Sequence, residues 1–183
     1  MRGSIICLEI LFVVSILLVS CGNNKTDEKT MALPDASEDK KMQTEQALRA
    51  ANEQFYTALN AVFIDNLQPM NDIWSHEADV TLMGPFGGRL TGWEAVGAEF
   101  KNVAAMKLGG KIVFKDLHLY AGSDLGYAIG VEDGENMDPD GKPVKVNHRA
   151  TNIFRLESGQ WKLVHHQTDL SPQLEQAATT ESK

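Results

Sequence analysis

The first clear hydrophobic period along the chain is helical. From Thr44 to about Ile64, apolar side chains recur every three or four residues, which predicts an amphipathic helix with Thr44 as its N-cap. Pro69 suits the first turn of a short second helix that ends near residues 74–76. A third helix is predicted to open at Trp93. Its apolar side consists of Val96, Phe100, Val103 and Ala104.

Elsewhere the period is two, which is typical of strands. Residues 78–83 and 89–91 are predicted to form two short partner strands around a glycine-rich turn. Four longer strands follow, joined by turns. They are predicted at residues 112–120, 125–133, 144–156 and 161–167. Because the helices precede most of the strands, we expect an α+β fold in which the N-terminal helices pack on a strongly curved antiparallel sheet that forms a cone.

The last strand carries polar side chains where apolar ones are expected. Trp161, Leu163, His165 and Gln167 share one face by the two-residue period, and His166 lies on the other. A face that is apolar at Trp161 and polar at Gln167 indicates a strand that runs from the hydrophobic core to a more polar, solvated region. The strand is therefore predicted to line a pocket for a small molecule.

Both ends of the chain differ from this domain. Residues 1–20 are predicted to be a signal peptide, because the apolar run is shorter than the ~20 residues of a membrane span. The small residues around Cys21 resemble the lipobox of bacterial lipoproteins. We expect a lipidated, flexible tether over residues 21–41, the domain over 42–171 and a disordered tail over 172–183. The expected location is the bacterial cell envelope, anchored to the membrane through lipid on Cys21 without spanning it.

Charge and cysteine content exclude several kinds of partner and chemistry. The net charge of −8 and the scattered lysines argue against nucleic acid as a partner. Of the two cysteines, Cys7 lies in the predicted signal peptide and Cys21 is predicted to be lipidated. Neither a disulfide nor thiol catalysis is therefore expected. No nucleotide-binding or metalloprotease motif is present, and no cofactor is expected.

Several short motifs along the domain resemble one family. They are Trp74-Ser75-His76, Gly84-Pro85-Phe86-Gly87-Gly88, Arg149-Ala150-Thr151 and the segment from Gly159 to His165. Together they resemble the SnoaL-like family of the nuclear transport factor two-like superfamily, which includes ketosteroid isomerase and has a cystatin-like cone fold. The resemblance implies a conical sheet around a pocket and a homodimer formed through the sheet. It does not imply one activity, because this fold serves enzymes, binding proteins and dimerisation modules.

The resemblance and the residue types together give a set of candidate ligand-binding residues. They are Tyr56, Trp74, His76, Phe86, Trp93, Arg149, Thr151, His165 and Gln167. As simpler alternatives, His76 suits a helix C-terminus, and the aromatic residues Trp74, Phe86 and Trp93 suit the core. His165 equally suits a histidine that closes the core.

Three residues are candidates for catalysis. His165 is the candidate acid/base, Arg149 the stabiliser of an anion and Glu132 a base. The simpler account of Arg149 is a salt bridge to Glu132 or Asp133 across the sheet. No metal is expected, because Gln167 replaces the second histidine of related sequences and the rings of adjacent histidines point to opposite faces.

These observations leave three functions open. The preferred interpretation is a lipid-anchored domain that binds a small, partly apolar molecule. The alternatives are an isomerase, dehydratase or cyclase that acts by proton transfer, and a noncatalytic dimerisation module. An enzyme is expected to bury a titratable side chain with a strongly shifted pKa in the pocket. A binding protein should have an apolar pocket without one, and a module should have a filled interior.

Overall fold

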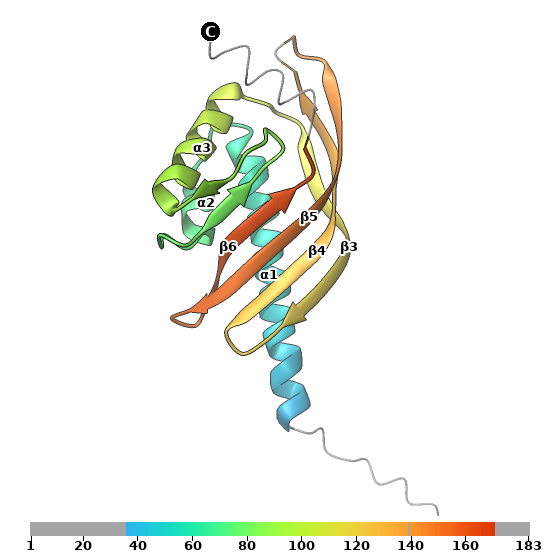
Figure 1. Cartoon of the computed structure of the whole chain (residues 1–183). Helices are drawn as coiled ribbons and strands as arrows, with labels where there is room; N and C mark the ends of the chain where they lie inside the picture. Colours follow the sequence, from blue (N-terminus) through green and yellow to red (C-terminus); the bar gives the residue numbers. More distant parts are fainter. Residues whose placement is uncertain (1–35, 139, 171–183) are drawn as a thin grey trace, which may run out of the picture. The chain divides into compact units, whose positions relative to one another are not determined.

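The computed structural model describes residues 36–138 and 140–170, which form three helices and one six-stranded sheet (Figure 1). The helices are α1 (Ala36–Val62), α2 (Gln68–Ile73) and α3 (Trp93–Met106). The strands are β1 (Thr81–Met83), β2 (Leu90–Thr91), β3 (Lys111–Ala121), β4 (Leu125–Met137), β5 (Pro143–Glu157) and β6 (Gln160–Thr168). The predicted α+β fold class and the predicted elements are confirmed.

The strand order in the sheet is β2-β1-β6-β5-β4-β3. Neighbouring strands from β3 to β6 are antiparallel, as predicted, and so are β1 and β2. The short strand β1 instead pairs parallel to β6, with Thr81 beside His165. The sheet is therefore mixed, and this pairing attaches the β1–β2 hairpin to the edge of the long antiparallel strands.

Helix α1 begins earlier than the sequence analysis predicts. Residues 36–41, expected to belong to a flexible tether, form its first turns, and Thr44 lies inside the helix, where its hydroxyl donates to the carbonyl of Lys40 at 2.8 Å. Two acidic residues in the first turn favour this start because they complement the helix dipole. The predictions for residues 1–35, including Cys21, and for the tail 171–183 lie outside the described residues.

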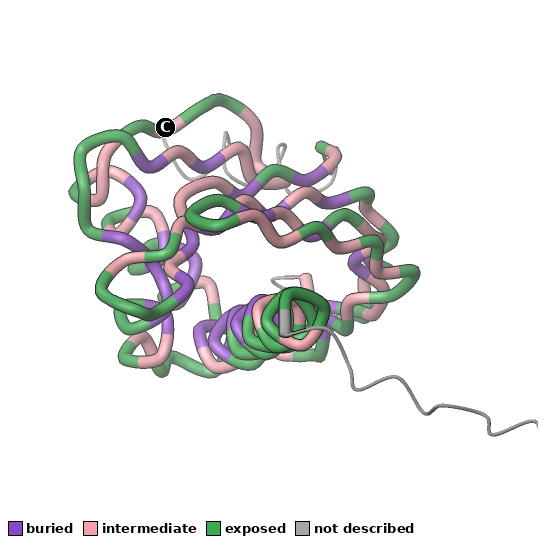
Figure 2. The backbone as a smooth tube through the Cα atoms, turned by 90° about the horizontal axis from the view of Figure 1, so that it is seen from below, coloured by how far each residue is buried: buried purple, intermediate pink, exposed green. Residues whose placement is uncertain are grey.

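The small side chains on the inner face of β4 allow α1 to lie close against the sheet. The face of β4 towards α1 begins Gly126, Ala128, Gly130, and a Cβ atom on Gly126 would lie 2.5 Å from Cδ2 of Leu48. Asn60 fixes the other end of the helix, because its amide bonds both the N–H and the carbonyl of Ile112 in β3 at 2.8 Å. Figure 2 shows α1 nearly end-on beneath the strands.

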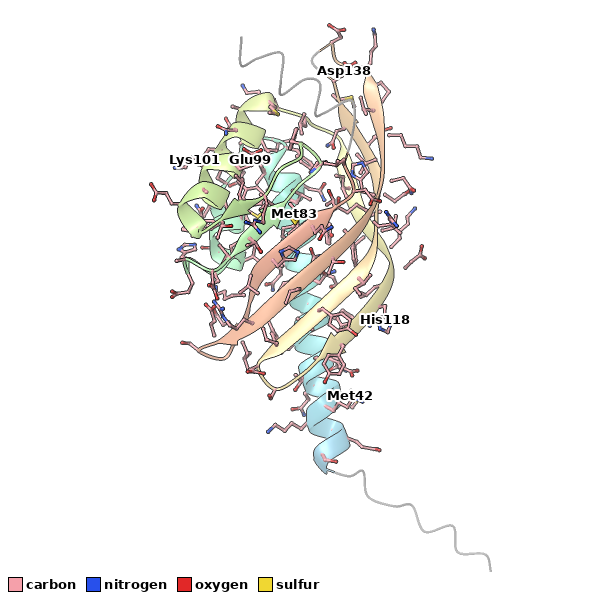
Figure 3. The ribbon with its side chains drawn as sticks, in the orientation of Figure 1. Met42, Met83, Glu99, Lys101, His118 and Asp138 are labelled. Carbon is pink, nitrogen blue, oxygen red and sulfur yellow. The ribbon has the colours of Figure 1, made fainter. Side chains whose placement is uncertain are left out.

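The opposite face of the sheet carries exposed apolar side chains. Val113 and Tyr120 on β3 and Ile129 on β4 are exposed there, and Tyr120 stacks on Tyr127 with ring centroids 5.6 Å apart. Figure 3 shows His118 projecting from β3 at this edge of the sheet. Among the described helices, none combines the length and apolar character of a membrane span.

Candidate functional site

A bulge in β6 decides which of its two histidines turns inward. Strands β5 and β6 pair in register up to Val164, which has no partner in β5. One extra residue reverses the alternation of the side chains beyond it. His166 is therefore buried, with 4% exposure, whereas His165 is half-buried and Gln167 exposed. The prediction that His165 and Gln167 continue the inward face of Trp161 is wrong for this reason.

A cavity of about 70 Å³ lies beside His166, between the inner face of the sheet and the elements packed on it. Most of its lining is apolar, and the side chains come from α1, α3, β1 and the turn at residues 84–87. The polar residues in the lining are Glu99, Glu132, Asn136, His148, His166 and Thr168. Figure 3 labels Glu99 on α3. The half-buried turn at residues 84–87 borders the cavity on one side and includes Phe86, one of the candidate ligand-binding residues.

Glu132 is the buried carboxyl group of this cavity. It is 3% exposed and lies on the inward face of β4, directly opposite His148 of β5. The hydroxyl of Tyr56 donates to its Oε1 at 3.1 Å. Burial raises the pKa of Glu132 from 4.5 to about 7, and the hydrogen bond from Tyr56 opposes this shift only in part. Near neutral pH this carboxyl is therefore able both to give and to accept a proton.

His166 lies next to Glu132, with 3.6 Å between its Nε2 and Oε1 of the glutamate. This separation is longer than a hydrogen bond, so the two groups are not bonded to each other, and both line the cavity. Burial, with the nearby His165 as a smaller cause, lowers the pKa of His166 to about 3. The imidazole is consequently neutral at the pH where Glu132 titrates.

Two asparagines complete a buried hydrogen-bond network. Nδ1 of His166 lies 2.6 Å from Oδ1 of Asn152, and Nδ2 of Asn152 donates to Oδ1 of Asn52 at 2.7 Å. The same Nδ2 donates to the hydroxyl of Tyr56 at 3.2 Å. Asn52 and Tyr56 are four residues apart on α1, so they occupy the same face of the helix. Burial, followed by the charge of Glu132, raises the pKa of Tyr56 well above its usual value and keeps the phenol a donor.

Arg149 does not reach the cavity. It lies on the outer face of β5, its side chain is 85% exposed, and it forms a bidentate ion pair with Asp169. The predicted contact with a ligand anion and the alternative salt bridge to Glu132 or Asp133 are both corrected. Thr151 shares this outer face, as predicted from the alternation, and therefore also points away from the cavity.

The remaining candidates lie elsewhere. Nδ1 of His165 is 2.7 Å from the hydroxyl of Thr81, and burial lowers its pKa. His76 is exposed, bonds the carbonyl of Asn71 at 2.9 Å through Nε2 and stacks on Trp93 at 4.2 Å. Trp74 is buried and borders, with His76, a separate surface depression of about 950 Å³. These residues do not line the cavity at Glu132.

Sequence reasoning missed seven polar residues of the cavity and its hydrogen-bond network. They are Asn52, Glu99, Asn136, His148, Asn152, His166 and Thr168. Two of them, His148 and Asn152, alternate with Arg149 and Thr151, so choosing the opposite face of β5 would have found both. Within the described residues, no three His, Cys, Asp or Glu side chains converge as metal ligands.

We expect Glu132→Gln to change how stability depends on pH. Because folding raises the pKa of Glu132 from 4.5 to about 7, the native state retains a proton that the unfolded state releases across this range. Wild-type stability is therefore lost as the pH rises, and the variant lacks this loss. Between pH 5 and pH 8, the free energy of unfolding of wild type should fall by about 2 kcal/mol relative to that of the variant, measured by urea denaturation.

The matched control is Glu135→Gln, which removes an exposed carboxylate from the same strand. Its free energy of unfolding should differ from wild type by the same amount at both pH values. An equally constant difference for Glu132→Gln would show that burial does not hold the proton on Glu132.

Comparison with known proteins gives a family and a fold. A family model described as SnoaL-like domain matches residues 48–171. A search of curated proteins finds no significant match. A candidate dehydratase of the NTF2-like family from Streptomyces avermitilis is 21% identical, with 71% of this chain and 97% of that chain covered and a TM-score of 0.63.

Two further solved structures share the fold at lower identity. The association domain of C. elegans CaMKII is 14% identical over 72% of this chain and 98% of that chain, with a TM-score of 0.56. An NTF2-like protein with a cystatin-like fold from Novosphingobium aromaticivorans is 13% identical over 79% and 92%, with a TM-score of 0.59. The family match confirms the resemblance to the SnoaL-like family seen in the sequence: this chain belongs to the SnoaL-like domain family, and it shares its fold with NTF2-like proteins.

Proposed function

We propose that the domain binds a small, partly apolar molecule in the cavity at Glu132 and catalyses a proton transfer on it, as in an isomerisation or a dehydration. The observation that carries this proposal is the buried pair of Glu132 and His166 in the cavity lining, 3.6 Å apart. A simple binding pocket has no need of a carboxyl whose pKa is raised to about 7. The similarity to a candidate dehydratase agrees with this choice.

The cavity limits the size and charge of the ligand. Its volume of about 70 Å³ corresponds to roughly five to seven water-sized spheres, so it suits a short molecule or the end of a longer one. Among the described residues, no lysine or arginine lines the cavity, whereas Glu99 and Glu132 do. An anionic ligand would have to lose its hydration beside these carboxyl groups without a cation to replace it. The proposed ligand is therefore neutral, with one carbonyl or hydroxyl group.

The proposed chemistry uses both members of the pair. One group gives a proton to the ligand oxygen, and the other accepts a proton from the adjacent carbon. The C–H bond breaks and its electrons form a carbon–carbon double bond, giving an enol. Return of a proton to carbon completes an isomerisation. Loss of a neighbouring hydroxyl as water completes a dehydration.

Solvent-hydrogen exchange tests this proposal without knowledge of the natural substrate. With 3-hydroxybutanone in D₂O, we expect wild type to accelerate deuterium uptake at the carbon next to the carbonyl, followed by NMR. Glu132→Gln should slow the catalysed exchange by about 100-fold or more, the usual contribution of a general acid or base. The control Glu135→Gln should match wild type, and Val103→Phe, which fills the cavity, should abolish exchange.

Ligand-observed NMR with butanone and with butanoate separates the two parts of the proposal. Butanone should bind and butanoate should not. If butanone binds but neither butanone nor 3-hydroxybutanone takes up deuterium, the domain is a noncatalytic binding protein. Tighter binding of butanoate would contradict the proposed neutral ligand.

We propose in addition that two copies pair through the outer face of the sheet. Support comes from the exposed apolar side chains on that face, which include Val113, Tyr120, Leu125 and Ile129 at 39–54% exposure. Exposed apolar side chains on one face of a sheet favour an interface where they lie together, as Tyr120 and Tyr127 do with ring centroids 5.6 Å apart. The fold is shared with a kinase association domain.

The oligomeric state of a charged variant tests this pairing. Light scattering after size exclusion should give a dimer for wild type and a monomer for Ile129→Glu, because pairing would bury an uncompensated charge. The control Ile64→Glu places the same charge on an apolar residue that is 71% exposed in the turn after α1, and it should remain dimeric. A monomeric wild type at micromolar concentration would contradict the proposal.

We propose finally that lipid on Cys21 holds the domain to a membrane of the bacterial cell envelope. The support is the sequence alone, namely the short apolar run and the small residues around Cys21.

Metabolic labelling of the full chain with an alkyne-tagged palmitate tests this anchor. Wild type expressed in bacteria should carry the label and sediment with membranes, and Cys21→Ala should lose the label. Cys7→Ala, the other cysteine of the chain, should remain labelled. An unlabelled wild type would show that Cys21 is not lipidated.

A further inference from the structure

We propose that Asn152 is a positioning residue that holds His166 in the tautomer with its proton on Nδ1, so that Nε2 is left as a proton acceptor beside Glu132. The inference rests on the proposed function for its chemical meaning, because it assigns the role of acid to Glu132 and that of base to His166. Its structural part concerns the free protein and does not depend on a substrate.

The argument begins with the amide of Asn152, which is completely buried. Its Nδ2 is committed to two acceptors, Oδ1 of Asn52 at 2.7 Å and the hydroxyl of Tyr56 at 3.2 Å. The hydroxyl of Tyr56 already donates its hydrogen to Glu132, so the opposite orientation would set the amide oxygen of Asn152 against an oxygen that has no hydrogen left to offer. This acceptor on α1 therefore turns Oδ1 of Asn152 towards His166.

An amide oxygen only accepts hydrogen bonds, so its partner must donate. Oδ1 of Asn152 lies 2.6 Å from Nδ1 of His166, and this ring nitrogen consequently carries the hydrogen. In a neutral imidazole the other nitrogen is then an acceptor. That nitrogen, Nε2, is the atom 3.6 Å from Oε1 of Glu132.

The remaining groups around His166 support a neutral ring. Glu132 of β4 lies 3.6 Å from its Nε2, and the apolar ring of Phe55 on α1 packs against it with ring centroids 4.9 Å apart. His148 of β5 lines the same cavity. His165, the neighbour of His166 in β6, lies on the outer face. The phenol is already committed as donor to Glu132, so the transferable proton of the pair belongs to the carboxyl group.

With these roles, the reaction neither gains nor loses a proton overall. The carboxylic acid of Glu132 protonates the ligand oxygen. The carboxylate formed in this step lies 3.6 Å from Nε2 of His166 and favours a charged imidazolium, so Nε2 accepts the proton from the adjacent carbon as Glu132 gives up its own. The products are a neutral enol, a carboxylate and an imidazolium. Passage of the proton from Nε2 to the carboxylate restores the starting pair, so no external acid or base is consumed.

Two-dimensional ¹H–¹⁵N NMR of the ¹⁵N-histidine-labelled full chain tests the tautomer directly. In wild type, Nδ1 of His166 should have the signature of a protonated ring nitrogen and Nε2 that of an unprotonated one. In Asn152→Leu the hydrogen should move to Nε2, where Glu132 is the remaining acceptor. Asn152→Asp keeps an oxygen acceptor for Nδ1 and should retain the wild-type tautomer.

The control is Asn147→Leu, which removes an exposed amide from the same strand and should leave His166 unchanged. A protonated Nε2 in wild type would overturn the inference, and so would an unaltered tautomer in a folded Asn152→Leu. Should that variant fail to fold, wild type and Asn152→Asp still decide the question. The wild-type tautomer without deuterium exchange would reject the proposed catalysis and leave the positioning role of Asn152 intact.

Discussion

Burial of a carboxyl group without a compensating cation is the constraint on which the site depends. Glu132 is enclosed by a phenol, a neutral imidazole and apolar side chains. Arg149 lies on the outer face of the sheet and is paired with Asp169, and Arg155, opposite the far end of β4, is paired with Asp79 and Glu157. Its ionised form is therefore not stabilised by charge, which is why its pKa rises towards neutrality. Burial of Glu132 therefore lowers the stability of the folded domain at high pH, and it also makes this carboxyl group able to give and accept a proton near neutral pH.

The arrangement of the backbone makes this burial feasible. Small residues on β4 allow α1 to approach the sheet, and the approach brings Asn52 and Tyr56 within hydrogen-bonding distance of β4 and β5. Larger side chains at these β4 positions would lift the helix and leave the carboxyl and amide groups without partners. The alternation of glycine and alanine with bulkier residues on β4 thus has two effects. It lets α1 pack on the sheet, and it lets the buried carboxyl and amide groups find hydrogen-bond partners.

The sequence predicted the fold well because helical and strand periods are local properties. It also named Tyr56 and Glu132, although nothing in their spacing indicated that they meet. It failed for His165, Gln167 and Arg149, since alternation tells which residues share a face without telling which face is covered by a helix. The bulge at Val164 was not predictable either, because this valine is an ordinary strand residue and the irregularity depends on how β5 and β6 pair.

That bulge also decides which of the tandem histidines of this chain faces the interior. A change between bulged and regular pairing of β5 with β6 exchanges adjacent side chains between the interior and the surface. Because His165 and His166 are consecutive, either pairing turns an imidazole towards the inner face of the sheet.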